Sequence, residues 1–327
     1  HRKLLKISPL RTDSHRVLFE SYLQEENYDA AWCMSAALKV LGDANDEEST
    51  FYNQQQNKVA SQPRATLTKR DWKKLYHSQL DVEMSRIFGI IATNIKPFAS
   101  DMRDYNLHKR KDKLDPKEQT PALRALNRAI NFEGIPEPLL YSKRDYSGFR
   151  NANTDPVAIL VGGDMMQARP DRELNFEAAK AVALIRPEFY CASALRSSDH
   201  LKTVFAAALA VQTGQIVGTQ NVEDAQEIAS EIMRLPEPVQ VQLREAVKAL
   251  LDKGQNPNVS RWLRAVDHTA SRVGLLLSGD LVTAVRMVDD EVNAIGKADA
   301  TEKKQELVKF GISEDFFELR SRLGLGL

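Results

Sequence analysis

Histidines are the side chains best suited to acid–base or metal chemistry near neutral pH, and the chain has six of them. His268 directly follows Asp267, and His200 directly follows Asp199. Neighbouring residues on a helix point about 100° apart. Asp267 and His268 therefore need not share a site, and the simpler interpretation of His268 is a partly exposed histidine. The polar segment around His200 indicates the start of a helix. No HxxxH spacing or cysteine partner accompanies His15, His77 or His108.

The two cysteines and a pair of glycines offer weaker alternatives. Cys33 and Cys191 lie far apart without a CxxC partner, which favours a reducing compartment over a disulfide framework. Both are expected to be inert packing thiols. Gly162 and Gly163 follow a probable strand but lack the GxGxxG spacing or the lysine of a phosphate loop. We therefore expect a cytoplasmic protein without a nucleotide site or a catalytic triad.

The composition argues against two classes of partner. The chain has 45 basic and 45 acidic residues, so its net charge gives no attraction to nucleic acid. The basic stretch at residues 108–117 is expected to be a solvated linker. A phosphate-binding patch is the alternative, although no aromatic residues interleave with the charges. The longest apolar stretches, such as residues 157–163 and 273–277, fall far short of the roughly 20 residues that a spanning helix needs. The charge balance alone names no partner, and the sequence predicts no membrane span.

At the N-terminal end of the chain, the sequence predicts a pair of helices. Apolar residues recur at the helical period between residues 13 and 42, which predicts two short helices joined near residues 26–27. Tyr28, Ala31 and the following Ala37–Leu38 pair resemble the second helix of a tetratricopeptide repeat. An ordinary helical hairpin is the alternative. A repeat unit of this kind needs neighbours to bury its core, so it would either cap an upstream array or dock on the following domain.

Composition changes along the chain predict three segments. Acidic residues 43–48 and polar residues 54–64 indicate a mobile connection. A capping box formed by Thr68 and Asp71 then opens the next helix. The predicted units are a tetratricopeptide-like hairpin at 1–62, a helical connector at 63–120 and a C-terminal domain at 121–327.

The C-terminal region predicts helices around a few strands, so the expected fold class is α+β, mainly α. Two extended runs, residues 138–142 and 157–161, flank the turn-rich segment GFRNANTDP and predict a small sheet or hairpin. A buried helix is expected at residues 173–189, stopped by Pro187. Further helices are predicted at residues 123–130, 201–211, 222–233, 238–251, 259–277, 283–292 and 314–323.

The order of segments in this region resembles a known family. GIPEPLLY, FRNANTDPVAILVGGDMM, DRELNFEAAKAVALIRPEF and, much later, DHTASRVGLLLSGDLVTAV resemble successive parts of the zinc metallopeptidases related to the CAAX prenyl endopeptidase. In that family a strand precedes an Asn-Ala segment, a second strand and a helix that carries HExxH. A later helix supplies a glutamate in an ExxAD pattern. The resemblance covers residues 121–281 and implies a metallopeptidase-like helical domain.

The resemblance also implies that the zinc ligands are lost. HExxH works because its two histidines lie one helical turn apart and its glutamate activates the bound water. At the corresponding positions stand Lys180 for the first histidine, Ala181 for the glutamate and Leu184 for the second histidine. Asp267 stands where the family has its glutamate ligand, and Ser271 stands at the following aspartate. A protonated lysine cannot bind zinc, so we expect no metal, no cofactor and no zinc-dependent hydrolysis.

The interpretation that follows is a pseudo-peptidase rather than an enzyme. It would act as a protein–protein interaction or scaffold module, and its former active-site groove could still hold a peptide. One alternative is an enzyme of a different class that uses Asp267, His268 and Lys180 as acids and bases. Another is a purely structural helical module in which the resemblance is coincidental.

The two charged replacements lead to a specific structural hypothesis. In the family, the first histidine and the glutamate of the later helix approach the same ion. Lys180 and Asp267 are therefore expected to form a buried ion pair, with the lysine ammonium in the region of the lost cation. In the alternative, Lys180 extends to solvent and Asp267 caps a local turn.

Overall fold

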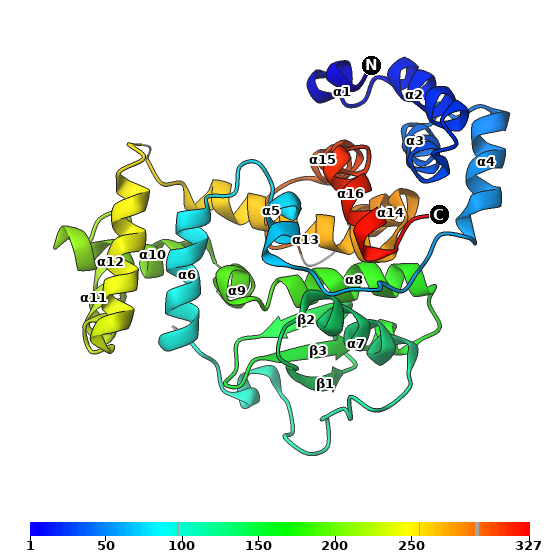
Figure 1. Ribbon diagram of the computed structural model, residues 1–327. Helices are drawn as coiled ribbons and strands as arrows, with labels where there is room; N and C mark the ends of the chain where they lie inside the picture. The colour runs from blue at the N-terminus through cyan, green and yellow to red at the C-terminus, as the bar shows by residue number, and fades with distance from the viewer. Residues whose placement is uncertain (97, 196, 255, 292–293) are drawn as a thin grey trace.

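The computed structural model describes residues 1–96, 98–195, 197–254, 256–291 and 294–327. Within these ranges the chain forms sixteen α-helices, two short 3-10 helices and one three-stranded sheet. The fold class is therefore α+β and mainly α, as the sequence predicts (Figure 1). No helix in these ranges combines the length and the apolar character needed to cross a membrane.

A helical hairpin opens the chain where the sequence predicts it. Helix α1 (Arg2–Ile7) precedes α2 (Thr12–Gln24) and α3 (Tyr28–Leu41), and α2 packs along α3. The side chain of Asn27 caps α3 by accepting a hydrogen bond from the backbone N–H of Ala30. The two helices therefore join at the expected residues.

The expected mobile connection is wrong over residues 46–56, which form helix α4 (Asp46–Gln56). Asn45 and Glu48 make a capping box at its start. Tyr52 stacks on Trp32 of α3, with ring centroids 5.4 Å apart and planes inclined by 6°. Acidic residues in the first turn favour a helix start, and aromatic contacts of Tyr52 with Trp32 and of Phe51 with Phe19 hold this mostly polar helix to the core.

The N-terminal helices dock on the C-terminal part of the chain. Arg320 of α16 (Glu314–Leu323) donates to Asp29 at the start of α3, at 2.6 Å. The Tyr52 hydroxyl donates to Asp280 at 2.9 Å. Arg172 donates to backbone carbonyl groups on both sides of this interface. Of the two arrangements expected for the hairpin, the chain adopts docking on the following domain.

The next helices belong to the same hydrophobic core as the C-terminal region. The predicted capping box of Thr68 and Asp71 opens α5 (Lys69–Leu75), which is followed by α6 (Val82–Asn94) and by η1 (Met102–Tyr105). Trp72 and Phe88 are buried in that core. Residues 108–117 form neither helix nor strand and are mostly exposed, as expected of a solvated linker.

The sheet contains one more strand than the sequence predicts. Strands β1 (Leu139–Lys143) and β3 (Ala158–Gly162) lie at the predicted runs and pair in parallel. Strand β2 (Phe149–Ala152) falls in the segment predicted as turns and pairs antiparallel to β3, so the strand order is β1-β3-β2. Only the two terminal residues of β2 are buried, so its sequence lacks the alternation that marks a strand.

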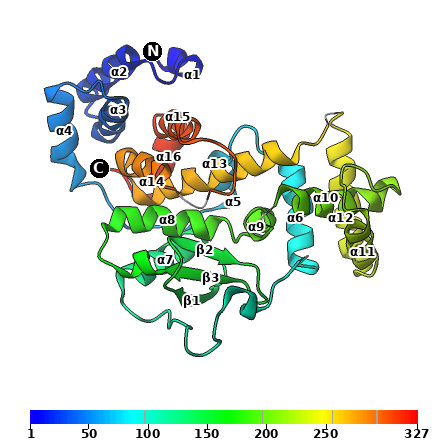
Figure 2. The same ribbon diagram turned by 180° about the vertical axis from the view of Figure 1, so that it is seen from behind.

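Two helices cover the sheet. Helix α7 (Pro121–Glu133) lies beside it, and α8 (Asp171–Ala183), which follows η2 (Gly163–Met166), runs along its β2 edge (Figures 1 and 2). The single helix expected at residues 173–189 is wrong, because α9 (Pro187–Ala194) begins at the proline. Proline disfavours helical geometry in the residue before it but suits the first turn of a helix.

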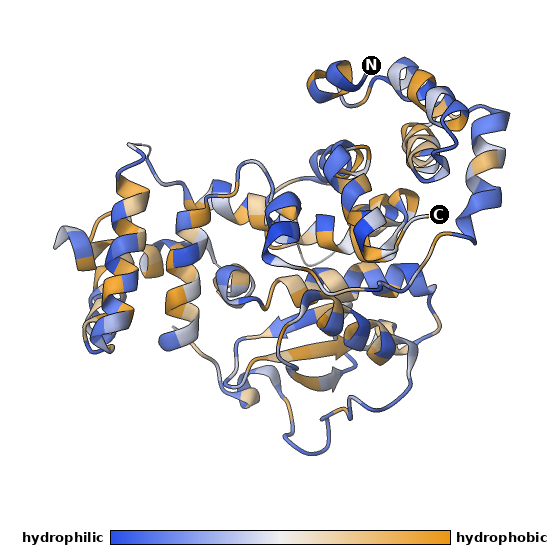
Figure 3. Cartoon of the chain, viewed as in Figure 1, coloured by the Kyte–Doolittle hydropathy of each residue, from blue (hydrophilic) through white to orange (hydrophobic). Residues whose placement is uncertain are grey.

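Helix α13 (Val259–Ser278) is the centre of the molecule and packs most extensively on α8. Gly274 permits this close approach, because a Cβ atom there would lie 2.9 Å from the ring of Phe176. Figure 3 shows apolar residues concentrated on β3 and on the inner helices. Val292, the end of a predicted helix, lies outside the described residues. The remaining helices are α10 (Ser198–Thr213), α11 (Val222–Met233), α12 (Glu237–Leu251), α14 (Leu281–Asp289) and α15 (Ala300–Gly311).

Candidate functional site

Lys180 of α8 and Asp267 of α13 form a buried ion pair. The Lys180 Nζ lies 2.8 Å from the Asp267 Oδ1. Lys180 is 6% exposed and Asp267 is 0% exposed. The alternative in which Lys180 extends to solvent and Asp267 caps a turn is therefore wrong, because the two side chains are buried against each other, Lys180 from the last turn of α8 and Asp267 from the middle of α13.

Two residues that the sequence did not single out complete the cluster. The Lys303 Nζ of α15 lies 2.8 Å from the Asp267 Oδ2. Glu291, which follows α14, accepts hydrogen bonds from Lys180 at 2.6 Å and from Lys303 at 2.5 Å. Positive and negative groups therefore alternate around a closed ring. We call Lys180, Asp267, Lys303 and Glu291 the ion ring.

The charges in the ion ring stabilise one another. Burial alone lowers the pKa of Lys180, but the carboxylates of Asp267 and Glu291 outweigh it and hold that pKa above its ordinary value. Burial alone raises the pKa of Asp267, but Lys180 and Lys303 outweigh it and hold that pKa well below its ordinary value. Lys180 and Asp267 therefore both remain charged at neutral pH.

The ion ring ties together segments that are distant in sequence. Helices α8, α13 and α15 and the segment after α14 each contribute one member. This last segment passes close over Asp267, because a Cβ atom on Gly296 would lie 3.1 Å from the carboxylate. The ring is therefore covered by protein on the side of Gly296.

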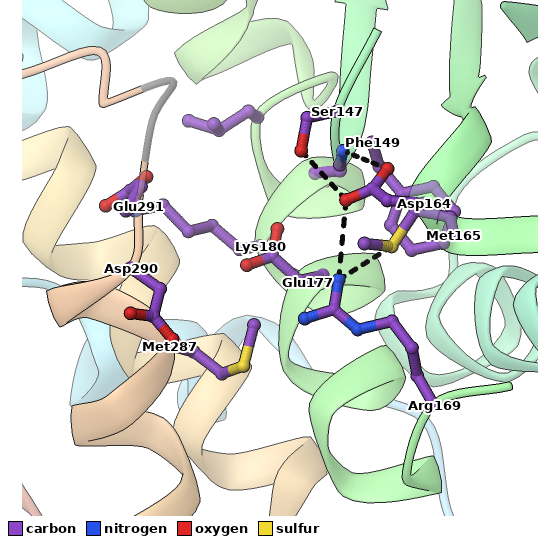
Figure 4. A pocket seen from close by; sticks show the side chains of 13 residues that line it. Ser147, Phe149, Asp164, Met165, Arg169, Glu177, Lys180, Met287, Asp290 and Glu291 are labelled. Carbon is purple, nitrogen blue, oxygen red and sulfur yellow. Dashed lines mark hydrogen bonds and ion pairs between the residues drawn. The ribbon is translucent and has the colours of Figure 1, made fainter. Parts of the chain in front are cut away.

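A cavity of 130 Å³ lies beside the ion ring, between the start of β2, η2, α8 and the end of α14 (Figure 4). Lys180, Ala181 and Leu184 line it together, so three of the five site residues expected from the resemblance face one space. Asp267 lies behind Lys180. Ser271 is buried on α13 and does not line the cavity.

Strand β2 is tied to α8 beside this cavity. The Asn151 side-chain amide donates hydrogen bonds to the backbone carbonyl of Ala181 and to the hydroxyl of Ser193, both at 3.2 Å. At the start of the strand, Asp164 accepts hydrogen bonds from the backbone N–H of Gly148 at 2.9 Å and from the Ser147 hydroxyl. Both ends of the cavity wall are therefore fixed by polar contacts.

Glu177 is a further titratable group that lines the cavity. It lies one turn before Lys180 on α8, and Figure 4 shows its carboxylate between Lys180 and Arg169. Burial raises its pKa to about 7, opposed by the charge of Lys180 and assisted by that of Glu291. No motif in the sequence singles out Glu177, because it lies three residues before the stretch compared with HExxH.

Comparisons with protein-family models, curated proteins and solved structures found no match to this chain. The chemistry of the site therefore follows from its own residues. Across the described ranges, no three His, Cys, Asp or Glu side chains are grouped so that they could hold a metal ion.

A second polar cluster lies next to the ion ring but does not open into the cavity. The rings of His77 and His268 are 4.9 Å apart. His77 contacts Glu306 of α15 at 2.9 Å, and His268 contacts Glu302 at 3.1 Å. His268 is 3% exposed, so the expectation of a partly exposed histidine is wrong. Asp267 and His268 have different partners, as their angular separation on a helix predicts.

The remaining candidates behave as the sequence predicts. His200 lies in the first turn of α10, where its backbone N–H donates to the Ser197 hydroxyl at 3.1 Å. Cys33 and Cys191 are buried free thiols, and burial raises the pKa of Cys191 to about 12. Neither thiol is positioned as a nucleophile.

Proposed function

We propose that the C-terminal part of this chain is a non-catalytic pseudo-peptidase that binds segments of partner proteins beside β2. The observation that supports the proposal is the ion ring, because it contains Lys180 and Asp267, the two residues that the resemblance sets at zinc-ligand positions. The ammonium groups of Lys180 and Lys303 carry two positive charges there, and Asp267 and Glu291 balance them. The ring thus supplies the charge and cross-linking of a divalent cation without its Lewis acidity.

The charge states in the ring argue against an acid–base role for its members. An acid or base needs a pKa near the working pH. The pKa of Lys180 lies above its ordinary value and that of Asp267 far below. His268 is engaged with Glu302. These three residues, which the alternative enzyme would use, are therefore held by structural partners.

The position of β2 supports binding of an extended segment. It is the last strand of the sheet, and its start lines the cavity. Helices α8 and α9 contact β2 along the strand, so an extended segment reaches β2 at its start, where Gly148 and Phe149 line the cavity. The cavity can then select one side chain of that segment.

A groove-blocking variant tests this function. Ala181→Trp places a bulky side chain in the cavity, and Ser230→Trp on the exposed side of α11 is the matched control. We expect an array of extended peptides to bind the unmodified protein and the control, to lose binding to Ala181→Trp, and to remain uncleaved. Metal-dependent cleavage of the peptides would support the enzyme alternative. Equal binding by all three proteins, or binding by none, would contradict the proposed groove.

A further inference from the structure

The cations that line the cavity already have partners. Lys180 belongs to the ion ring. Arg169 contacts Glu173 at 3.3 Å and Asp164 at 3.5 Å. No positive charge among the described lining residues is thus left to balance a further carboxylate.

Two carboxylates of the cavity, in contrast, have no such partner. Within the described part of the chain, neither Glu177 nor Asp290 forms a hydrogen bond or ion pair through its side chain. Glu177 is partly buried and lines the cavity, and this burial raises the pKa of its carboxyl group. A carboxylate removed from water without a donor or counter-ion is unfavourable. The carboxylates of Glu177 and Asp290 therefore lack a counter-ion, and a bound cation would supply it.

The walls suit a long aliphatic chain that ends in such a cation. Phe149, Met165, Leu184 and Met287 supply the apolar part of the lining. Methionine side chains adapt to irregular shapes, and the methylene groups of lysine and arginine pack along apolar surfaces while their charged ends find polar partners. The cavity combines these walls with the two carboxylates.

We propose that this cavity receives a lysine or arginine side chain from a basic, extended segment of a partner protein. The cationic end lies against Glu177 and Asp290, and the methylene groups pack between Met165 and Met287. The inference rests on the proposed function, because the guest side chain belongs to the segment bound at the start of β2. It adds the partner's chemical class, which the groove alone does not specify.

Protonation of Glu177 should be linked to this binding. Its raised pKa reflects burial first, with Lys180 opposing the shift and Glu291 adding to it. Arg169 and Asp164 act in opposite directions from the far wall. A bound cation favours the ionised carboxyl, so binding lowers the pKa of Glu177 and releases a proton near neutral pH.

The test uses the full chain and synthetic extended peptides of one Thr/Val background, with a single central residue that is Lys, Arg, Met or Glu. Affinities are measured by calorimetry for the unmodified protein, Glu177→Gln, Asp290→Asn and the control Asp289→Asn. Asp289 is exposed, adjoins Asp290 and does not line the cavity.

We expect the Lys and Arg peptides to bind at least about tenfold more tightly than the Met peptide, with the Glu peptide weakest. Glu177→Gln and Asp290→Asn should each reduce this preference, and Asp289→Asn should preserve it. Binding without preference for a basic residue, or a preference that survives both cavity variants, would overturn the inference but leave the proposed function intact. Binding by no peptide would overturn both.

Discussion

Two buried carboxyl groups at different places in the core show what burial does with and without a partner. Asp267, in the middle of α13, is 0% exposed and lies between the ammonium groups of Lys180 and Lys303. Glu133, at the end of α7, is 2% exposed, and neither of its oxygens has a hydrogen-bond partner in the described residues. Both are desolvated, yet their pKa values move in opposite directions.

The two pKa values differ because Asp267 has cations beside it and Glu133 has none in contact, and not because one group is more deeply buried. Burial alone would raise both pKa values, and it raises that of Glu133 well above the ordinary value, with only a weaker opposing effect from Arg186. For Asp267 the two lysines reverse the shift. The core thus tolerates an ionised carboxylate only where the chain supplies cations for it. The region around the ion ring is specialised, whereas Glu133 is a stability defect near neutral pH.

Removing a cation from the ion ring should have the largest effect. Lys180→Met keeps an unbranched side chain but leaves Asp267 and Glu291 with one ammonium between them. We expect the free energy of unfolding to fall by about 3–5 kcal/mol, measured by urea unfolding. Lys202→Met, which removes an exposed lysine paired with Asp199, is the control and should change it by less than about 1 kcal/mol. A similar small change for both variants would show that the ring is not stabilising.

Removing both members of one pair should be less harmful than removing the lysine alone. In the double variant Lys180→Met with Asp267→Leu, the remaining Lys303 and Glu291 still pair at 2.5 Å. Because the cost of the single variant is mainly an uncompensated carboxylate, the double variant should recover part of the lost stability. Additive losses in the same urea experiment would contradict this explanation.

Replacing Glu133 should raise the free energy of unfolding, whereas the ion-ring variants lower it. Glu133→Met removes a buried group that lacks hydrogen bonds, so we expect a gain of about 1–3 kcal/mol in the free energy of unfolding at pH 8. The pKa of Glu133 is raised in the folded state. Its penalty is therefore absent below the unfolded pKa of about 4.3 and grows as the pH rises above it. The gain should accordingly shrink toward pH 4, and a gain independent of pH would show that the carboxyl does not titrate as described.

The smallest effect on stability is expected from replacing His268, which lies beside the ion ring. Burial lowers its pKa, opposed mainly by the hydrogen bond with Glu302, while His77 lowers it further and Asp267 and Glu306 raise it. A lowered folded pKa means that stability is present above the unfolded value of about 6.5 and is lost as the pH falls below it. His268→Gln should lose less stability than the unmodified protein on this acid side, as measured by thermal unfolding at several pH values. An identical pH profile would contradict the shift.

Local patterns made much of the helical fold predictable. The periods of α3, α11, α12 and α16 specify their own boundaries, because side chains three and four residues apart must share a face. The elements that the sequence does not predict depend on contacts with residues distant in the sequence. Strand β2 exists because β3 pairs with it, and α4 is held to α3 by the stacking of its Tyr52 on Trp32.

The residues of the ion ring also fall into two groups, those that the sequence singles out and those that only the structure reveals. In the sequence, only the family resemblance connects Lys180 with Asp267. Their 2.8 Å contact agrees with the ion pair that it implies. Glu291 and Lys303 carried no motif, since a charged residue in a loop or on a helix usually faces solvent. Their roles follow from the packing of α14 and α15 against α13, which no spacing in the sequence encodes.

The most direct test of the central claim is the metal content of the purified full chain by mass spectrometry, before and after incubation with zinc and dialysis. A general protease assay with and without a chelator accompanies it. Because the proposed function has the ammonium groups of Lys180 and Lys303 in place of a metal cation, we expect zinc far below one equivalent in both samples and no chelator-sensitive proteolysis. Near-stoichiometric zinc that survives dialysis, together with proteolysis that the chelator abolishes, would contradict it.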